Sequence, residues 1–182
     1  MTPTIHSTRL DLIPMTPAVL RALLAGDHEG AGRWLGVRWP ADCEIHPDVL
    51  ELRLGQLESD PELQPWLLRA IVLREEGVAV GTMGFHATPG HESLAGLSPG
   101  GVEFGYGLTA VYRRRGLATE AIEAMMSWAK EEHGVNRFVL SISPENGPSL
   151  ALAAKLGFRK IGSHMDECDG PEDIFERVWG MD

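Results

Sequence analysis

The chain has 182 residues, of which 43% are hydrophobic and 23% are charged, a composition typical of a globular domain large enough to bury a sizeable core. Its 26 acidic residues outnumber its 16 basic ones, giving a formal net charge of -10. This excess argues against a surface for nucleic acid or anionic membranes, and it favours small cations such as amines.

The N-terminal third predicts one strand and two helices. Leu10 and Leu12 alternate with polar residues until Pro14, as in a half-buried strand. Residues 16–26 follow as a helix, with Thr16 as N-cap, proline at the first helical position and glycine at the end. Residues 48–57 place three leucines on one face and predict a second helix.

Trp34 and Trp39 lie between these helices and either line a pocket or fill the core; we favour the core, because large aromatics dominate burial. Residues 66–87 predict two antiparallel strands around a tight turn at residues 74–77. Residues 88–101 are rich in glycine, serine and proline, which is typical of a surface loop.

The C-terminal half alternates strands and helices. Residues 101–109 and 137–143 predict strands, and residues 116–134 predict the strongest helix of the chain, with one apolar face formed by Ile122, Met125, Met126 and Ala129. A further helix is expected over residues 146–157, and two final strands over residues 158–162 and 174–180. The central order is therefore strand, arginine-glycine loop, helix, strand, helix.

The segment YRRRGLAT, residues 112–119, lies between a predicted strand and the start of the strongest helix. Backbone N–H groups at a helix N-terminus, the helix dipole and a glycine that permits close approach together favour an anion. Arginines add charge-assisted hydrogen bonds. The alternative is a solvated surface turn. The Gly-Lys-Ser/Thr phosphate loop and the Gly-x-Gly-x-x-Gly pattern are both absent from the sequence.

Three stretches resemble a known family. EFGYGLTAVYRRRGLATEA, SPENGPSLALAAKLGFRKIG and the N-terminal STRLDLIPMTP are similar to the GCN5-related N-acetyltransferase (GNAT) family, in its RimJ/RimL-type branch of ribosomal-protein N-terminal acetyltransferases. The resemblance implies an α/β (α+β) fold with a mixed, mostly antiparallel central sheet, splayed in the middle, and helices on both faces. It implies one domain over residues 1–182, with an acetyl-CoA core at 102–162 and acceptor-side elements at 14–60 and 87–101.

The resemblance also implies an acetyl-CoA site without a metal. The backbone of residues 115–119 would hold the CoA pyrophosphate, with Arg113 and Arg114 near the phosphates. The main chain of residues 106–108 would pair with the pantetheine arm on the free edge of the splayed strands. The expected acetyl-CoA-binding residues are Tyr106, Gly107, Leu108, Arg113, Arg114, Arg115, Gly116, Leu117, Ala118, Thr119 and Asn146.

Two residues are candidates for the chemistry. Glu103 stands where many family members carry the general base, and it is otherwise a solvated carboxylate at a strand end. Ser149 stands where the branch places a serine near the thiol, and it is otherwise a helix cap. The tyrosine acid that many relatives place on the final helix is missing, so Ser149 or water would return the proton to the leaving thiolate.

Other positions agree with the branch or depart from it. Ala110 replaces its usual proline and Arg114 replaces a glycine, so Arg114 either contacts a CoA phosphate or points into water. Tyr106 and Tyr112 match branch positions, where we expect packing in the core or the loop. No histidines show metal-ligand spacing.

The resemblance thus predicts an N-acetyltransferase that moves the acetyl group of acetyl-CoA to a primary amine by direct attack in a ternary complex. The acceptor would be a protein N-terminus or a small molecule, and not nucleic acid or a membrane. A homodimer is compatible with the branch. The alternative is a non-catalytic acyl-CoA-binding sensor or regulatory module.

Cys43 and Cys168 are far apart and show no disulfide framework, as expected of reduced cytosolic thiols. The N-terminus lacks an apolar run of signal-peptide length, and no later segment approaches a membrane span. These features predict a cytoplasmic protein.

Overall fold

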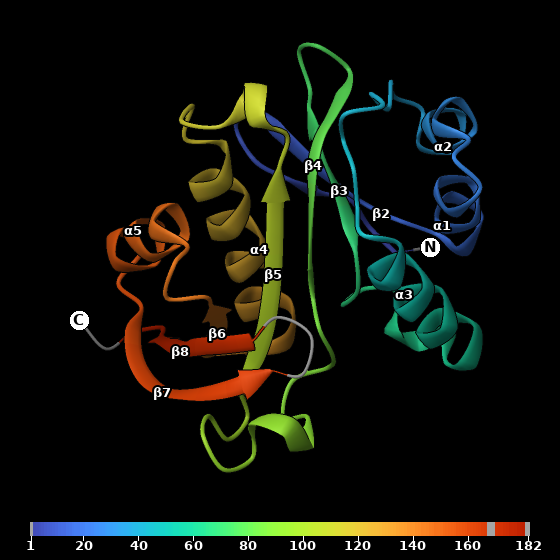
Figure 1. Ribbon diagram of the computed structural model, residues 1–182. Coiled ribbons are helices and arrows are strands. Elements are labelled where there is room, and N and C mark those ends of the chain that lie inside the picture. Colours follow the sequence, from blue (N-terminus) through green and yellow to red (C-terminus); the bar gives the residue numbers. More distant parts are fainter. Residues whose placement is uncertain (1, 167–169, 181–182) are drawn as a thin grey trace. The chain divides into compact units, whose positions relative to one another are not determined.

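The computed structural model describes residues 2–166 and 170–180 and divides into two compact units (Figure 1). The first unit contains Met1–Gly84 and Tyr106–Met125, and the second contains Phe85–Gly105 and Met126–Asp182. The chain thus passes between them more than once, within β4, β5 and α4. One domain spanning residues 1–182 stays a prediction.

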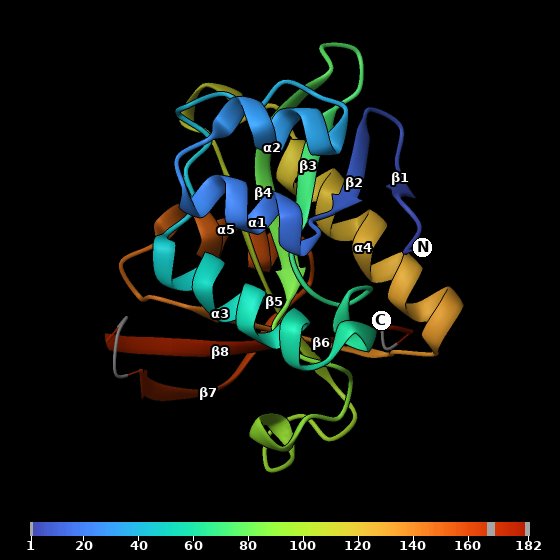
Figure 2. The same ribbon diagram turned by 90° about the vertical axis from the view of Figure 1, so that its right-hand side faces the viewer.

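The first unit is a small sheet with helices. Its elements are β1 (Ile5–His6), β2 (Leu10–Pro14), α1 (Pro17–Leu24), α2 (His28–Leu35), α3 (Pro47–Ser59), the 3-10 turn η1 (Pro61–Leu63), β3 (Arg69–Leu73), most of β4 (Val78–Phe85), the 3-10 turn η3 (Ala110–Tyr112) and the start of α4 (Leu117–His133). Strands β1 to β4 are antiparallel neighbours in that order. Figures 1 and 2 show α1, α2 and α3 on one side of β2–β4 and the first turns of α4 on the other.

The alternation of β2 divides its side chains between those two faces. Leu12 pairs with Ile71 of β3, and Ile13 pairs with Ala70, so neighbouring pairs point to opposite faces. Ile13 and Ala70 belong to the core beneath the helices, together with Leu20 of α1. The strand predicted from Leu10 and Leu12 and the two predicted helices are therefore confirmed, and α3 extends the second to residues 47–59.

Helix α2 was not anticipated. Its eight residues include two glycines, which weaken any helical pattern. Its ends nevertheless carry standard signals: the Asp27 carboxylate accepts from the N–H of Gly30, and Gly36 terminates the helix at φ 73°. By contrast, the predicted N-cap Thr16 precedes α1 without a side-chain capping hydrogen bond.

The two tryptophans differ in environment. Trp39 is buried, and its indole N–H donates to the carbonyl of Cys43, so the core prediction is confirmed there. Trp34, on α2, is 69% exposed, so the core prediction is wrong for it. Neither tryptophan belongs to a recognisable hydrophobic periodicity in the sequence, so the sequence could not indicate which of the two is buried.

Arg69 is an unexpected cation in the core of the first unit. Its side chain is only 1% exposed, and its guanidinium donates to the carbonyls of Pro3, Leu12 and Pro65 at 2.9 to 3.2 Å. Burial lowers its pKa to about 10, which still leaves it charged at neutral pH. These bonds attach the N-terminal segment to β3.

The second unit is a mixed sheet with helices. It contains the 3-10 turn η2 (Glu92–Leu94), the start of β5 (Val102–Leu108), the end of α4, β6 (Arg137–Ile142), α5 (Gly147–Lys155), β7 (Arg159–Asp166) and β8 (Gly170–Val178). Strand β8 pairs antiparallel with both β6 and β7. The one parallel pair within the described part of this unit is β5 with β6. The predicted mixed, mostly antiparallel α/β class is confirmed.

The parallel pair is short. It joins Val102 to Phe138 and Glu103 to Val139 and then ends, although β5 continues to Leu108 and β6 to Ile142. This is the divergence that the resemblance implied for these two strands. Within the second unit, Phe104 and Gly105 of β5 add no further pair with β6.

The predicted surface loop at 88–101 is more firmly held than its composition indicates. The N–H of Gly90 donates to the carbonyl of Gly101 and closes the loop at its base. Leu94 packs against Val139 and Ile174 in a core cluster of the second unit. Ser98 is fully buried and donates to a carboxylate oxygen of Glu176 at 2.6 Å.

Candidate active site

The loop between η3 and α4 presents unpaired backbone donors. The first backbone bond of the helix runs from the N–H of Glu120 to the carbonyl of Gly116. Within the part of the chain that the structure describes, the N–H groups of residues 115–119 donate to no protein acceptor. Gly116 has φ 77°, which glycine adopts without steric cost. The first unit therefore holds a glycine turn with free donors at the N-terminus of a 17-residue helix, an arrangement that suits an anion.

Arg114 has a positive φ of 61°, unlike any other non-glycine residue in the described ranges. Side chains beyond glycine are strained in this left-handed region. The branch pattern has glycine at this position, and the backbone shows why glycine suits it. Arginine at this position therefore places a side chain on a strained backbone conformation.

Arg113 turns back onto β5. Its Nε donates to the carbonyl oxygen of Leu108 at 2.9 Å. Leu108 follows Gly107, whose carbonyl oxygen would lie 2.0 Å from a Cβ added at Gly81 of β4, so the two backbones approach closely there. The expected contact of Arg113 with a phosphate stays a prediction.

Tyr112 packs in the loop, as expected, and the packing of Tyr106 stays a prediction. The hydroxyl of Tyr112 donates to Glu76 at 2.8 Å, and its ring lies 5.0 Å from the guanidinium of Arg115. The hydrogen bond to Glu76 raises the pKa of Tyr112, so its hydroxyl stays protonated at neutral pH. Tyr106 is half-buried on β5.

Glu103 lies in the second unit in a polar cluster. Its Oε1 accepts a hydrogen bond from the hydroxyl of Ser141 on β6 at 2.6 Å. The Nδ1 of His86 lies 3.7 Å from Oε2, a separation at which charge acts but a hydrogen bond is weak. The carboxylate is 21% exposed. It is therefore not the solvated strand-end carboxylate of the alternative interpretation, although it is not deeply buried either.

Opposing effects set the pKa of Glu103. Burial raises it, while the neighbouring imidazole of His86, the Ser141 hydroxyl and the charge of His164 lower it, and the net pKa lies below the usual value of 4.5. Glu103 is thus ionised at neutral pH and can accept a proton. Ser141 and His86 were not singled out in the sequence, because each is distant along the chain from Glu103.

Asn146 and Ser149 share the first turn of α5. The side-chain oxygen of Asn146 accepts from the backbone N–H of Ser149 at 3.2 Å, so Asn146 is the N-cap. The capping role considered for Ser149 therefore belongs to Asn146. Asn146 is exposed and Ser149 half-buried. Their proposed contacts with the cofactor stay predictions.

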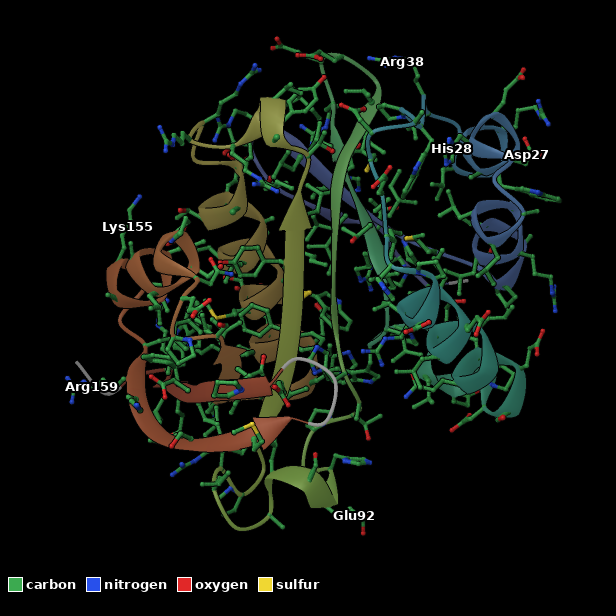
Figure 3. All side chains as sticks on the ribbon, viewed as in Figure 1. Asp27, His28, Arg38, Glu92, Lys155 and Arg159 are labelled. Atoms are coloured by element: carbon green, nitrogen blue, oxygen red, sulfur yellow. The ribbon has the colours of Figure 1, made fainter. Side chains whose placement is uncertain are left out.

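The first unit also contains two cavities near its N-terminal helices. One, of about 670 Å³, is lined by α2 and the segment after it, including His28 and Arg38, which are labelled in Figure 3. The other, of about 400 Å³, is lined by Leu23, His28 and Cys43 among others. The smaller cavity is lined by residues inside the segment 14–60 that is expected on the acceptor side. The larger one is lined by residues of the same segment and by Gly77.

Cys43 borders the smaller cavity as a buried thiol. Burial raises its pKa to about 11, so it is protonated and weakly nucleophilic at neutral pH. Cys168 lies outside the described residues. In the described ranges no set of three or more histidine, cysteine or acidic side chains is arranged to hold a metal ion. No described helix combines the length and apolar character needed to span a membrane.

A family model described as acetyltransferase (GNAT) domain matches residues 9–159. The chain belongs to this GNAT family. The match contains β2, the arginine-glycine loop, Glu103 and the first turn of α5, so every residue predicted for the GNAT site lies inside it.

Individual relatives agree with the GNAT assignment. N-acetyltransferase p20 of Bacillus licheniformis, itself uncharacterized, is 29% identical over 117 residues, covering 63% of this chain and 62% of that protein. A mycothiol acetyltransferase of Salinispora tropica is 26% identical over 147 residues, covering 81% of this chain but 46% of that protein. The chain thus matches only part of the length of these curated relatives.

The solved structure of RimL, a ribosomal L7/L12 alpha-N-protein acetyltransferase in complex with coenzyme A, is similar in fold. The TM-score is 0.67 at 17% sequence identity, and the match covers 99% of this chain and 100% of RimL. At this identity the likeness shows a shared fold.

Proposed function

We propose that this chain transfers an acetyl group from acetyl-CoA to a primary amine, within a complex that holds both substrates. The observation that carries the proposal is the set of unpaired N–H groups of residues 115–119, which include the turn at Gly116 and the start of α4. A pyrophosphate would satisfy these donors and the positive end of the helix dipole. Membership of the GNAT family supports acetyl-CoA as the molecule that carries it.

Acetyl-CoA would continue from this loop along β5. The backbone of residues 106–108 belongs to the part of β5 beyond its pairing with β6, and it would pair with the pantetheine arm. Arg113 and Arg114 would face the phosphates, and the exposed amide of Asn146 would meet the pantetheine region. A pre-arranged backbone would hold the thioester carbonyl for attack without reorganisation.

Glu103 would act as the general base. A primary amine is protonated at neutral pH, so the Glu103 carboxylate would take one proton, directly or through water. The amine nitrogen would then bond to the thioester carbonyl carbon, and the carbon–sulfur bond would break. The nitrogen would release its second proton to water, and the CoA thiolate would receive a proton from water directly or from Ser149, whose hydroxyl water would then reprotonate. The lowered pKa of Glu103 keeps its carboxylate ionised at neutral pH and also makes it a weaker base.

The acceptor would reach the site from the side of the N-terminal helices. The cavity of about 670 Å³ falls in the size range of small-molecule sites. RimL acts on a protein N-terminus, and its fold covers nearly the whole of this chain. We therefore place peptide N-termini first among the acceptors to test, followed by small amines.

The test is a screen that follows free thiol from acetyl-CoA in the presence of peptides and small amines, with Glu103→Gln as the matched variant. We expect turnover with at least one acceptor and a loss of roughly 100-fold in Glu103→Gln, the usual scale for a general base. Reactions without acceptor correct for thiols of the protein itself. Binding of CoA without turnover on any acceptor, and no effect of Glu103→Gln, would instead identify a sensor.

A further inference from the structure

Arg9, in the turn between β1 and β2, contacts the backbone of the arginine-glycine loop. Its Nη1 donates to the carbonyl oxygen of Arg115 at 3.0 Å. Its Nη2 lies 3.5 Å from the position that a Cβ would take at Gly116. The guanidinium therefore lies on the carbonyl side of the peptide that joins Arg115 to Gly116.

Glu120, in the first turn of α4, holds this guanidinium in place. Its Oε2 accepts from the Nε of Arg9 at 2.6 Å, and its Oε1 accepts from the backbone N–H of Arg9 at 2.6 Å and from the Ser7 hydroxyl at 2.7 Å. The Glu120 side chain is 17% exposed, and both oxygens of its carboxylate accept hydrogen bonds from the segment Ser7 to Arg9. Charge-assisted bonds of this kind are the stronger ones in proteins.

The geometry has a consequence for the anion site. A trans peptide is planar, with its C=O and N–H directed oppositely. Because Arg9 fixes the carbonyl of Arg115, it also aims the N–H of Gly116 away from itself, toward the open side of the loop. The N–H of Glu120 bonds the carbonyl of Gly116, which fixes the next peptide as well.

We infer that Arg9 is a positioning residue for coenzyme A. Its bond to the Arg115 carbonyl holds the pyrophosphate-binding backbone in its binding conformation, and Glu120, itself bonded by Ser7, holds Arg9 in place. The inference rests on the proposed function, since it takes the ligand of the loop to be acetyl-CoA. It gives the N-terminal Ser-Thr-Arg stretch a role in cofactor binding although that stretch need not touch the cofactor.

Arg74 offers a matched control in the same segment. Its guanidinium donates to Asp11 at 2.8 Å and to the carbonyls of Ser7 and Leu10 at 2.9 and 3.0 Å. Its side chain is 45% exposed, against 44% for Arg9. Arg74 therefore ties the same turn to the sheet with similar bonds, but among the described residues its guanidinium donates only to the segment of residues 7–11 and not to residues 113–119.

The experiment is calorimetric titration of coenzyme A into the wild type, Arg9→Met and Arg74→Met, with thermal unfolding of each without ligand. We expect Arg9→Met to bind coenzyme A about ten-fold more weakly, which corresponds to about 1.4 kcal/mol, and Arg74→Met to stay within about two-fold of the wild type. Both should lower the unfolding temperature to a similar extent. In turnover, Arg9→Met should raise the KM for acetyl-CoA and leave kcat nearly unchanged.

Glu120→Gln is a milder second variant, which keeps an acceptor for the Ser7 hydroxyl while removing the charge that holds Arg9. It should weaken coenzyme A binding by a few-fold, and it decides the matter if Arg9→Met does not fold. Unchanged affinity in the Arg9 or Glu120 variant, or equal losses in the Arg9 and Arg74 variants, would overturn the inference alone. A wild type that does not bind coenzyme A would overturn the proposed function and this inference with it.

Discussion

Arg114 has a backbone angle that favours the glycine of the branch pattern and strains an arginine. A left-handed conformation costs a non-glycine residue about 1–2 kcal/mol, whereas glycine adds about 0.5–1 kcal/mol of unfolded-state entropy to the cost of folding. The first effect is larger. Arg114→Gly should therefore raise the free energy of unfolding by about 0.5–1 kcal/mol, measured by urea denaturation.

Arg115→Gly is the matched control for that prediction. Arg115 adjoins Arg114 in the same exposed loop but has no positive φ. Without strain to relieve, the added flexibility of glycine dominates, and this variant should be less stable than the wild type. A loss of stability in Arg114→Gly equal to that of Arg115→Gly would contradict the strain assigned to Arg114.

Ser141 is one of the groups, after His86, that lower the pKa of Glu103, and it does so through one hydrogen bond. Its removal in Ser141→Ala should raise the pKa of Glu103, because the bond favours the ionised carboxylate. As pH falls, Glu103 would then be protonated sooner, so the acidic limb of the kcat/KM profile should move to higher pH. The KM for acetyl-CoA should not change.

The control for the Ser141 prediction is Ser163→Ala, on an exposed position of β7. It should leave the pH profile in place. An acidic limb at the same pH in Ser141→Ala and wild type would show that the carboxylate governing the profile is not the one bonded to Ser141.

At the level of elements, the loop at 88–101 depends on a contact that its composition conceals. Ser98 and the Nη1 of Arg137 share one oxygen of Glu176, which is only 12% exposed. Ser98→Ala removes one partner from a mostly buried carboxylate, so it should destabilise the protein by about 1–3 kcal/mol. Hydrogen exchange of residues 90–101 should accelerate.

Ser93→Ala tests whether that effect is specific to the buried anchor. Ser93 lies in the same loop and is exposed, and among the described residues its hydroxyl hydrogen-bonds only the neighbouring His91. Its replacement should change stability by less than about 0.5 kcal/mol. Equal exchange rates in the Ser98 and Ser93 variants would mean that Leu94 and its apolar neighbours hold the loop without the polar contact.

Across the whole molecule, the features that the sequence predicted well are those with local causes. The apolar face at Ile122 and Met126 and the terminal Gly134 predict α4 because helix periodicity and caps act over a few residues. The glycine loop before α4 follows for the same reason. The short α2 contains two glycines, which weaken its helical pattern, so it was not predicted in spite of its cap residues.

The contacts that the sequence could not predict join residues far apart in the chain. Arg9 and Glu120 are separated by 111 positions, and Ser98 and Glu176 by 78. Many other acidic side chains could serve an arginine or a serine, and only the folded backbone selects among them. The resemblance placed Glu103 in a site, but its partners Ser141 and His86 became visible only in the structure.

The central claim is that the loop before α4 binds the pyrophosphate of acetyl-CoA. Its most direct test is calorimetric titration of coenzyme A into Gly116→Asp and Gly134→Asp. Both glycines have positive φ, 77° and 69°, at opposite ends of α4, so the two variants carry similar backbone strain. We expect that Gly116→Asp loses coenzyme A binding while Gly134→Asp retains the wild-type affinity. Wild-type affinity in a folded Gly116→Asp would contradict it.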